Sequence, residues 1–220
     1  MSEENGHQEL EAEPIEPEGP GEEPELDDET LERRRLALSH VRKFGDPVLR
    51  SPASPITDFG PELAADVERM AAMMHDALGV GLAATQLGVM RRLLVFQAGP
   101  DATPTALVNP EIEWSSEESV LAEEGCLSLP GIVVDVERPL HIRVRALDTG
   151  GEQLSIEASG LEARVIQHEV DHLDGVLMLD RTPRDQRRGA LRALRNGGEF
   201  SPSPDREEEP EPATATARGA

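Results

Sequence analysis

The strongest hydrophobic pattern of the chain lies in PELAADVERMAAMMHDAL, residues 61–78. Apolar side chains recur there at intervals of three and four residues, which places them on one face of a helix. Pro61 suits a first helical position, and Gly79 is a residue that commonly ends a helix. The stretch therefore predicts an amphipathic helix whose apolar face comprises Leu63, Val67, Met70, Met74 and Leu78.

Other segments show the patterns of strands. The runs LLVFQ (93–97) and ALV (106–108) are typical of buried strands. Apolar and polar residues alternate in PLHIRVRALD (139–148), which predicts a half-buried strand. The turn DTGG (148–151) then leads into QLSIEA, so we expect a β-hairpin.

A second helix is predicted over LEARVIQHEVDHL, residues 161–173. Ser159 followed by Glu162 is typical of a capping box at its start. At about 100° per residue, one face of this helix spans about 60° and holds Leu161, Val165, His168 and His172. Strands clustered before and around two helices, without regular β-α-β alternation, predict an α+β domain with an antiparallel sheet.

The charge of the chain is concentrated at its two ends. The formal net charge is −23 over 220 residues, yet residues 1–32 alone hold 14 acids and neither Lys nor Arg. Both ends are rich in Glu and Pro and poor in large apolar residues, so burial there cannot offset the entropy lost on ordering. We therefore expect disordered acidic segments at 1–38 and 199–220, a folded domain over 39–182 and a basic helix over 183–198.

Composition also restricts where the chain works. Its one cysteine cannot form an intrachain disulfide, which fits a reducing compartment. The acidic N-terminus has neither the pattern of a secretory signal nor the arginines of a transit peptide. No apolar run approaches the roughly 18 residues that cross a bilayer. These features predict a cytoplasmic protein, with neither a membrane nor DNA among its partners.

The stretch QHEVDHLDG, residues 167–175, carries a metal-binding pattern. His168 and His172 lie on successive turns of one helix and can share a cation such as Zn²⁺ or Fe²⁺. Glu169 is then placed to accept a proton from bound water. The alternative is a helix with two buried, hydrogen-bonded histidines. Two ligands do not complete a catalytic site, for which three protein ligands and an open position are expected.

Cys126, in EEGCLSLPG (123–131), is a candidate for the third ligand. Gly125 and the Pro130-Gly131 pair indicate a tight, non-helical backbone that can present a side chain to a cavity. A thiolate there would favour softer divalent metals over Mg²⁺ or Ca²⁺. The alternative is a small buried hydrophobe, which an isolated cysteine more often is.

A third stretch, GVGLAATQLG (79–88), follows the first predicted helix. Its two glycines allow close approach to the backbone, whose N–H and C=O groups could pair with an extended peptide. Gln86 carries an amide that can donate a hydrogen bond to a developing oxyanion. By itself, a glycine-rich segment after a helix is usually only a turn.

Together, and in this order, the three stretches resemble the motifs of the peptide deformylases: GVGLAATQ, EGCLS and QHEVDHLDG. The segment KFGDPVLRSPASPI (43–56) also resembles the start of these enzymes, and the resemblance extends to about residue 182. It implies that residues 39–182 form a single compact catalytic domain, in which antiparallel β-sheets pack around a central metal-binding helix.

The resemblance also implies a role for each candidate residue. Glu169 would be the general acid and base, while the Gln86 amide and the backbone N–H of Leu127 would hold the oxyanion. One Fe²⁺, replaceable by Zn²⁺, Ni²⁺ or Co²⁺, would be bound by Cys126, His168 and His172. The methionine pocket and the peptide groove would be lined by Val80, Gly81, Glu124 and Val165.

The activity implied by the resemblance is hydrolysis of the N-formyl group from the formyl-methionine of newly synthesised polypeptides, with release of formate. Nascent formyl-methionyl peptides would then be the substrates. The sequence departs from the family pattern at Thr85, where many relatives have proline. It also departs from that pattern in its acidic extension and its acidic tail.

The segment RTPRDQRRGALRALR, residues 181–195, holds six arginines and one aspartate. Such a run is either a solvated helix face or a surface for phosphate-rich RNA. In some peptide deformylases a C-terminal helix docks on the ribosome. We hypothesise that this segment also docks on the ribosome, and that the acidic tail that follows it weakens this attraction.

Two other functions fit parts of the pattern. A metalloprotease of the HExxH type would share the two histidines and Glu169, but such enzymes usually recruit Glu or His as the third ligand. A metal-binding module without catalysis would be expected to lack Glu169 or Gln86, and both are present. The remaining histidines show no paired spacing and are expected to be ordinary surface or core residues: His7, His40, His75 and His141.

Overall fold

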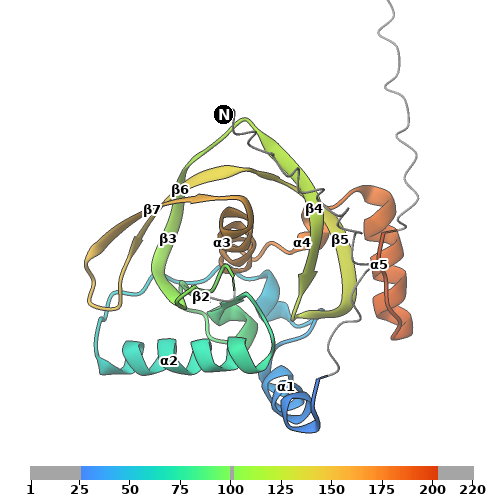
Figure 1. Cartoon of the computed structure of the whole chain (residues 1–220), viewed down its shortest axis with the longest axis horizontal. Coiled ribbons are helices and arrows are strands. Elements are labelled where there is room, and N and C mark those ends of the chain that lie inside the picture. The colour runs from blue at the N-terminus through green and yellow to red at the C-terminus, as the bar shows by residue number, and fades with distance from the viewer. Residues whose placement is uncertain (1–25, 100–101, 203–220) are drawn as a thin grey trace, which may run out of the picture.

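The computed structural model describes residues 26–99 and 102–202, which contain two antiparallel sheets (Figure 1). The five-stranded sheet has the order β1-β2-β3-β6-β7. Its strands are β1 Gly81–Ala83, β2 Leu93–Phe96, β3 Thr105–Ser115, β6 His141–Leu147 and β7 Gln153–Ser159. The smaller sheet pairs β4 Ser119–Cys126 with β5 Leu129–Pro139. The predicted α+β class with antiparallel pairing is confirmed.

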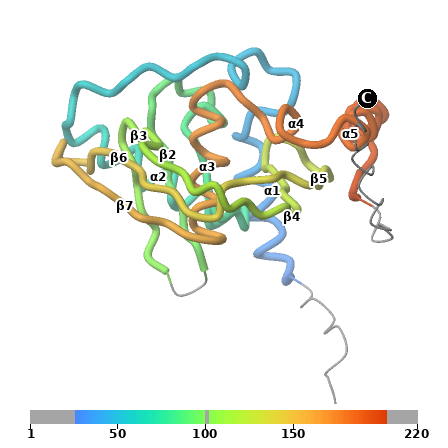
Figure 2. The backbone as a smooth tube through the Cα atoms, turned by 90° about the horizontal axis from the view of Figure 1, so that it is seen from above, coloured from blue at the N-terminus to red at the C-terminus, as the bar shows by residue number. Residues whose placement is uncertain are grey.

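Helix α3, Gly160–Leu173, lies between the two sheets in the middle of the domain, and α2, Pro61–Asp76, covers one side (Figure 1). The other helical elements are α1 Asp28–His40, η1 Pro47–Arg50, η2 Ala84–Leu87, α4 Met178–Arg181 and α5 Arg184–Asn196. Seen from above, α5 lies at one end of the domain, beyond α4 (Figure 2). No helix among the described residues has both the length and the apolar character needed to cross a membrane.

Helix α3 is central because buried apolar residues recur along it from Ala163 to Leu173. Its buried apolar residues pack against strand residues such as Leu94, Ile142 and Val144 in one core cluster. Those helix residues are Ala163, Val165, Ile166, Val170 and Leu173. Leu161, which the helical pattern places on the same face, is instead 57% exposed, because it lies in the first turn at the mouth of a pocket.

Helix α2 follows the predicted pattern with one difference at its end. Leu63, Met70 and Met74 are buried against strands β1, β2 and β3 in a second core cluster. The helix ends at Asp76, so Leu78 does not continue its apolar face. Leu78 is 50% exposed and adopts a left-handed φ of 57°, which turns the chain sharply into β1.

We predict disorder for residues 1–38, but residues 28–40 form helix α1. Asp27 caps this helix by accepting a hydrogen bond of 2.7 Å from the backbone N–H of Thr30, and Ala37 is buried against the domain. Both contacts stabilise a segment that has few apolar residues. Residues 1–25, for which we also predict disorder, lie outside the described residues.

The start of the acidic tail is also more ordered than we predict from composition. Phe200 exchanges backbone hydrogen bonds with Gly131 and Val133 and packs in a third core cluster with β5, α4 and α5. That cluster anchors the predicted basic helix, α5, to the smaller sheet. Residues 203–220 lie outside the described residues.

The capping box predicted at Ser159 does not form. Ser159 is the N-cap residue of α3, but its side chain makes no capping bond. Its hydroxyl lies 2.8 Å from Nδ1 of His141, its cross-strand neighbour, and this pairing competes with the cap. The predicted hairpin is confirmed as β6 and β7.

Candidate metal centre

The two sheets and α3 bring three predicted ligand residues to one point. Cys126 ends strand β4, and His168 and His172 come from successive turns of α3. One ligand atom from each of the three residues lies within 4.8 Å of the other two. The Sγ atom of Cys126 is 3.2 Å from Nε2 of His172. Among the described residues, this is the one group of three such side chains gathered closely enough to hold an ion.

The chemistry of the three residues fits a divalent transition metal. Burial would raise the pKa of the Cys126 thiol, but His172 and His168 hold it well below its usual range. The lowered pKa favours the thiolate, which is the form that binds metals. Burial would likewise lower the pKa of His168, but Cys126 and Glu124 raise it well above its usual range. The raised pKa of His168 indicates that the site stabilises a positive charge. One thiolate with two imidazoles is a ligand set suited to Fe²⁺ or Zn²⁺.

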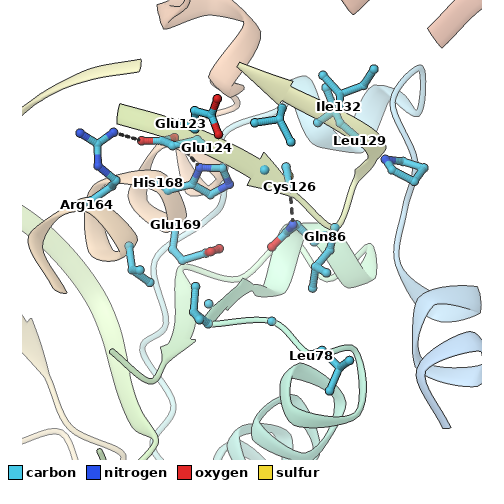
Figure 3. Close-up of a pocket in the computed structure, with 18 of the residues that line it drawn as sticks. Leu78, Gln86, Glu123, Glu124, Cys126, Leu129, Ile132, Arg164, His168 and Glu169 are labelled. Atoms are coloured by element: carbon cyan, nitrogen blue, oxygen red, sulfur yellow. Dashed lines mark hydrogen bonds and ion pairs between the residues drawn. The ribbon is translucent and has the colours of Figure 1, made fainter. Parts of the chain in front are cut away.

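Glu124 orients His168 from behind. Its Oε2 atom lies 2.9 Å from Nδ1 of His168, which leaves the other ring nitrogen for the shared site (Figure 3). Glu124 also accepts two hydrogen bonds from Arg138, at 2.6 and 2.9 Å, and one of 2.8 Å from Arg164. Burial would raise the pKa of the Glu124 carboxyl, but Arg138 and His168 lower it to about 2. The carboxylate is thus charged and fully engaged.

The same buried network extends to the C-terminal part of the chain. Arg138, only 3% exposed, donates a hydrogen bond of 2.9 Å to Asp171 of α3. Asp171 also accepts from Arg181 at the end of α4, at 2.6 Å and 2.5 Å. Each buried charge therefore has an opposite charge within hydrogen-bond distance, which is the condition for burying charge at all.

Glu169 lies beside the three candidate ligands with its carboxylate directed into the pocket, toward Gln86 and Cys126 (Figure 3). It is buried, and its Oε2 atom has no hydrogen-bond partner among the described residues. Burial raises the pKa of the Glu169 carboxyl. Gly81 makes room for this side chain, since a Cβ atom at residue 81 would lie 2.9 Å from Cδ and Cγ of Glu169.

The side chain of Gln86, on η2, is held in one orientation. Its Oε1 accepts a hydrogen bond of 2.9 Å from the backbone N–H of Ala83. Its Nε2 donates to Oγ of Ser128 at 3.2 Å and lies 3.7 Å from Sγ of Cys126. The amide N–H₂ group therefore faces the candidate metal centre. Nearby, Nζ of Lys43 donates a hydrogen bond of 3.0 Å to the carbonyl oxygen of Leu127. This bond stabilises the turn between β4 and β5.

A pocket of about 430 Å³ opens beside these groups. Its lining includes the residues predicted for the methionine pocket and groove, namely Val80, Gly81, Glu124 and Val165. Glu169, Gln86, Leu127, Cys126 and His168 line it too. β1 and β4 lie at the free edges of their sheets, and both contribute residues to this pocket. An extended peptide can therefore pair with backbone groups on either side.

The sequence patterns did not identify Arg138, Arg164 or Lys43. A signal for Arg138 is present, because Val134, Val136 and Arg138 alternate along β5 and all three are buried. An arginine in register with two buried valines indicates an inward charge that needs a partner. Arg164 and Lys43 show no comparable pattern.

Comparisons with known proteins agree with this geometry. The polypeptide deformylase family model matches residues 38–188. The peptide deformylase of Acidothermus cellulolyticus is 45% identical over 160 residues, a match covering 73% of this chain and 87% of that protein. That of Thermotoga neapolitana is 49% identical over 144 residues, covering 66% of this chain and 87% of that protein.

Solved structures give the same result. The crystal structure of the Thermotoga maritima peptide deformylase is similar with a TM-score of 0.63 and 48% identity, covering 65% of this chain and 96% of that chain. The Synechococcus elongatus peptide deformylase in complex with actinonin gives a TM-score of 0.67 and 40% identity, covering 72% of this chain and 87% of that chain.

These matches decide against the metalloprotease and the non-catalytic module as explanations of the HExxH pattern. They span the three sequence motifs and the strands and helix that carry them. The chain belongs to the peptide deformylase family, and it is a metal-dependent hydrolase that removes the N-formyl group from the N-terminal formyl-methionine of newly synthesised polypeptides.

Proposed function

We propose that one Fe²⁺ is bound by Cys126, His168 and His172, and that Glu169, Gln86 and Leu127 act on the formyl group. The convergence of a cysteine sulfur and two imidazoles beside a buried carboxylate is the observation that carries this proposal. Zn²⁺, Ni²⁺ or Co²⁺ would fit the same ligand set.

The formyl-methionyl peptide would lie extended between the edges of β1 and β4. Backbone groups near Gly81 and Glu124 would hold its main chain, while Val80 and Val165 would contact the methionine side chain. An unbranched thioether suits an adaptable apolar slot of this kind. The Glu124 carboxylate is engaged with Arg138 and His168. It would therefore form part of the wall of this slot and would not bind the substrate through its charge.

In the proposed mechanism an ion held by Cys126, His168 and His172 would supply Lewis acidity, which lowers the pKa of water toward neutrality. Glu169 accepts the proton as this water attacks the formyl carbon. The side-chain amide of Gln86 and the backbone N–H of Leu127 donate to the oxygen that becomes negative, and each such donor is typically worth about 2.7–4 kcal/mol. Glu169 then returns the proton to the departing amine, and formate leaves.

The test is formate release from formyl-Met-Ala, with metal content measured on the same anaerobic sample. We expect turnover to scale with iron content up to one ion per chain, and Cys126→Ser to lose the ion on brief dialysis. Full activity in a sample that holds no transition metal would contradict the proposal. So would Cys126→Ser that retains iron as firmly as the original chain.

We further propose that α5 docks on the ribosome in the cytoplasm. Gln186 and Ala190 face the smaller sheet and are buried, whereas the arginines of this helix are exposed. A cationic face beyond α4 suits the phosphates of RNA. Arg187 also lies 3.5 Å from Asp180, an ion pair at the surface that RNA would compete with.

Co-sedimentation with ribosomes across a salt series tests this docking. Binding should weaken steeply with salt and should be lost when four arginines become alanine, namely Arg184, Arg187, Arg188 and Arg192. The matched control removes four exposed arginines elsewhere, namely Arg35, Arg69, Arg143 and Arg145. Equal binding by the two quadruple variants would rule the docking out.

A further inference from the structure

Helix α1 contributes to the pocket although most of it precedes the family match, which begins at residue 38. Arg34 and Leu38 of α1 line the same pocket as Cys126 and Glu169. In the close-up, the faint blue helix α1 lies at the lower right, on the same side of the pocket as Leu129 (Figure 3). The extension therefore adds a wall to the site, in addition to residues shared with the family.

This wall is held in place by specific contacts. Ala37 and Val41 are buried, and Asp27 caps the start of α1. Arg33 lies 4.0 Å from Asp76 at the end of α2. The cap stabilises the helix itself, and the contacts from Arg33 to Val41 hold its second half against the domain, beside the pocket.

Arg34 differs from its neighbours in charge pairing. Arg33 lies near Asp76, and Arg35 donates two hydrogen bonds to Glu32, at 2.8 and 2.6 Å. Arg34 is exposed and has neither an ion pair nor a hydrogen bond among the described residues. A guanidinium group left unpaired at a pocket rim can bind a carboxylate with both arms of its fork.

The other charges of the pocket do not offer the same opportunity. Arg164 is engaged with the Glu124 carboxylate and with the carbonyls of Val120 and Val136. Glu123 is exposed on β4, on the side of Glu124 rather than beside α1 (Figure 3). Among the cations that line the pocket, Arg34 is therefore the one without a partner in the described part of the chain.

We propose that Arg34 and Leu38 form a subsite for an acidic side chain in the two residues that follow formyl-methionine. This inference rests on the proposed placement of the peptide between β1 and β4. Leu38 would contact the aliphatic part of the Glu or Asp side chain, and the Arg34 guanidinium would pair with its carboxylate. Because the pair is exposed to water, it changes kcat/KM by roughly two- to fivefold.

The experiment measures kcat/KM of the full metal-loaded chain on amidated tripeptides, so that no terminal carboxylate confuses the result. The substrates are formyl-Met-Ala-Ala, its Glu variants at the second and third positions, and the matching Lys variants. We expect the better Glu peptide to exceed its Lys counterpart, mainly through KM, and the difference to shrink with salt.

Arg34→Glu should invert this preference toward Lys, measured as the ratio of kcat/KM for the Glu and Lys peptides. Arg35→Glu is the matched control, since it changes the same charge on the same helix outside the pocket lining, and it should keep the preference. No Glu preference in the original chain, or the same ratio in Arg34→Glu, would overturn the subsite. Lack of turnover on every tripeptide would instead count against the proposed function.

Discussion

The two walls of the pocket are built on different physical principles. In the inner wall, formed by β4, β5 and α3, the buried charges behind the candidate ligands meet opposite charges, as Arg138 meets Glu124 and Asp171. The outer wall, formed by α1, presents exposed charges, and one of them, Arg34, is unpaired within the described chain. The comparison teaches that support and recognition place opposite demands on charge, since the groups that support a reacting centre need fixed partners whereas a rim needs free ones.

The largest expected effect comes from the inner wall, at Glu169. Glu169→Ala should retain the bound metal but lose roughly 10²–10⁴-fold in kcat, because the proton that moves during hydrolysis has no acceptor. Formate release and metal content on the same sample measure both quantities. Glu162→Ala, on the same helix but outside the pocket lining, is the control. Near-normal turnover in Glu169→Ala would remove that carboxylate from the mechanism.

The second-largest effect is expected at Arg138, which pairs with Glu124 and Asp171 behind the candidate ligands. Arg138→Met leaves Glu124 and Asp171 without one buried partner each, and breaking a buried pair typically costs about 3–5 kcal/mol. Chemical denaturation of the metal-loaded enzyme measures this loss. Metal affinity should fall as well, by about 10–100-fold, because Glu124 is no longer held against His168.

Arg138→Lys separates charge from geometry at the same position. A lysine keeps the positive charge but cannot donate in parallel to both oxygens of Glu124. It should therefore recover part of the stability and part of the metal affinity. If Met and Lys variants both retained metal like the original chain, Arg138 would have no role in positioning the metal ligands.

The smallest effect is expected on the outer wall. Arg35→Ala removes an ion pair with Glu32 in which both side chains are mostly exposed, at 71% and 63%. Exposed pairs of this kind contribute little because water screens them. Thermal unfolding should show no measurable change in Tm, and activity on formyl-Met-Ala should be unchanged. A clear drop in Tm would show that α1 depends on surface charge and would weaken the contrast between the walls.

Sequence patterns predicted the elements that can be recognised from a short continuous stretch of residues. The spacing in residues 61–78 and 161–173 predicted the helices observed as α2, which ends at Asp76, and α3. The alternation around the DTGG turn predicted β6 and β7. The resemblance to known motifs also predicted that Cys126 joins the two histidines, and the three residues do lie together. The roles assigned to these residues stay predictions until the experiments above are done.

The features that the patterns missed depend on contacts between distant residues. Strands β4 and β5 were not predicted, because Gly125 and Pro130 suggested a loop, whereas their pairing stabilises both. Helix α1 depends on a cap and on the burial of Ala37 in a sequence that otherwise suggests disorder. Leu161 and Leu78 fit helical spacing, but neither packs in the core, because each lies where its helix meets the pocket or ends.

The two edge strands that line the pocket, β1 and β4, have a consequence for the range of substrates if the peptide binds as proposed. Main-chain groups are the same in every polypeptide, so a protein that binds through them accepts chains of nearly any sequence once the first residue fits. Residues further along would then alter the rate by small factors only. A single enzyme of this design can serve a whole proteome.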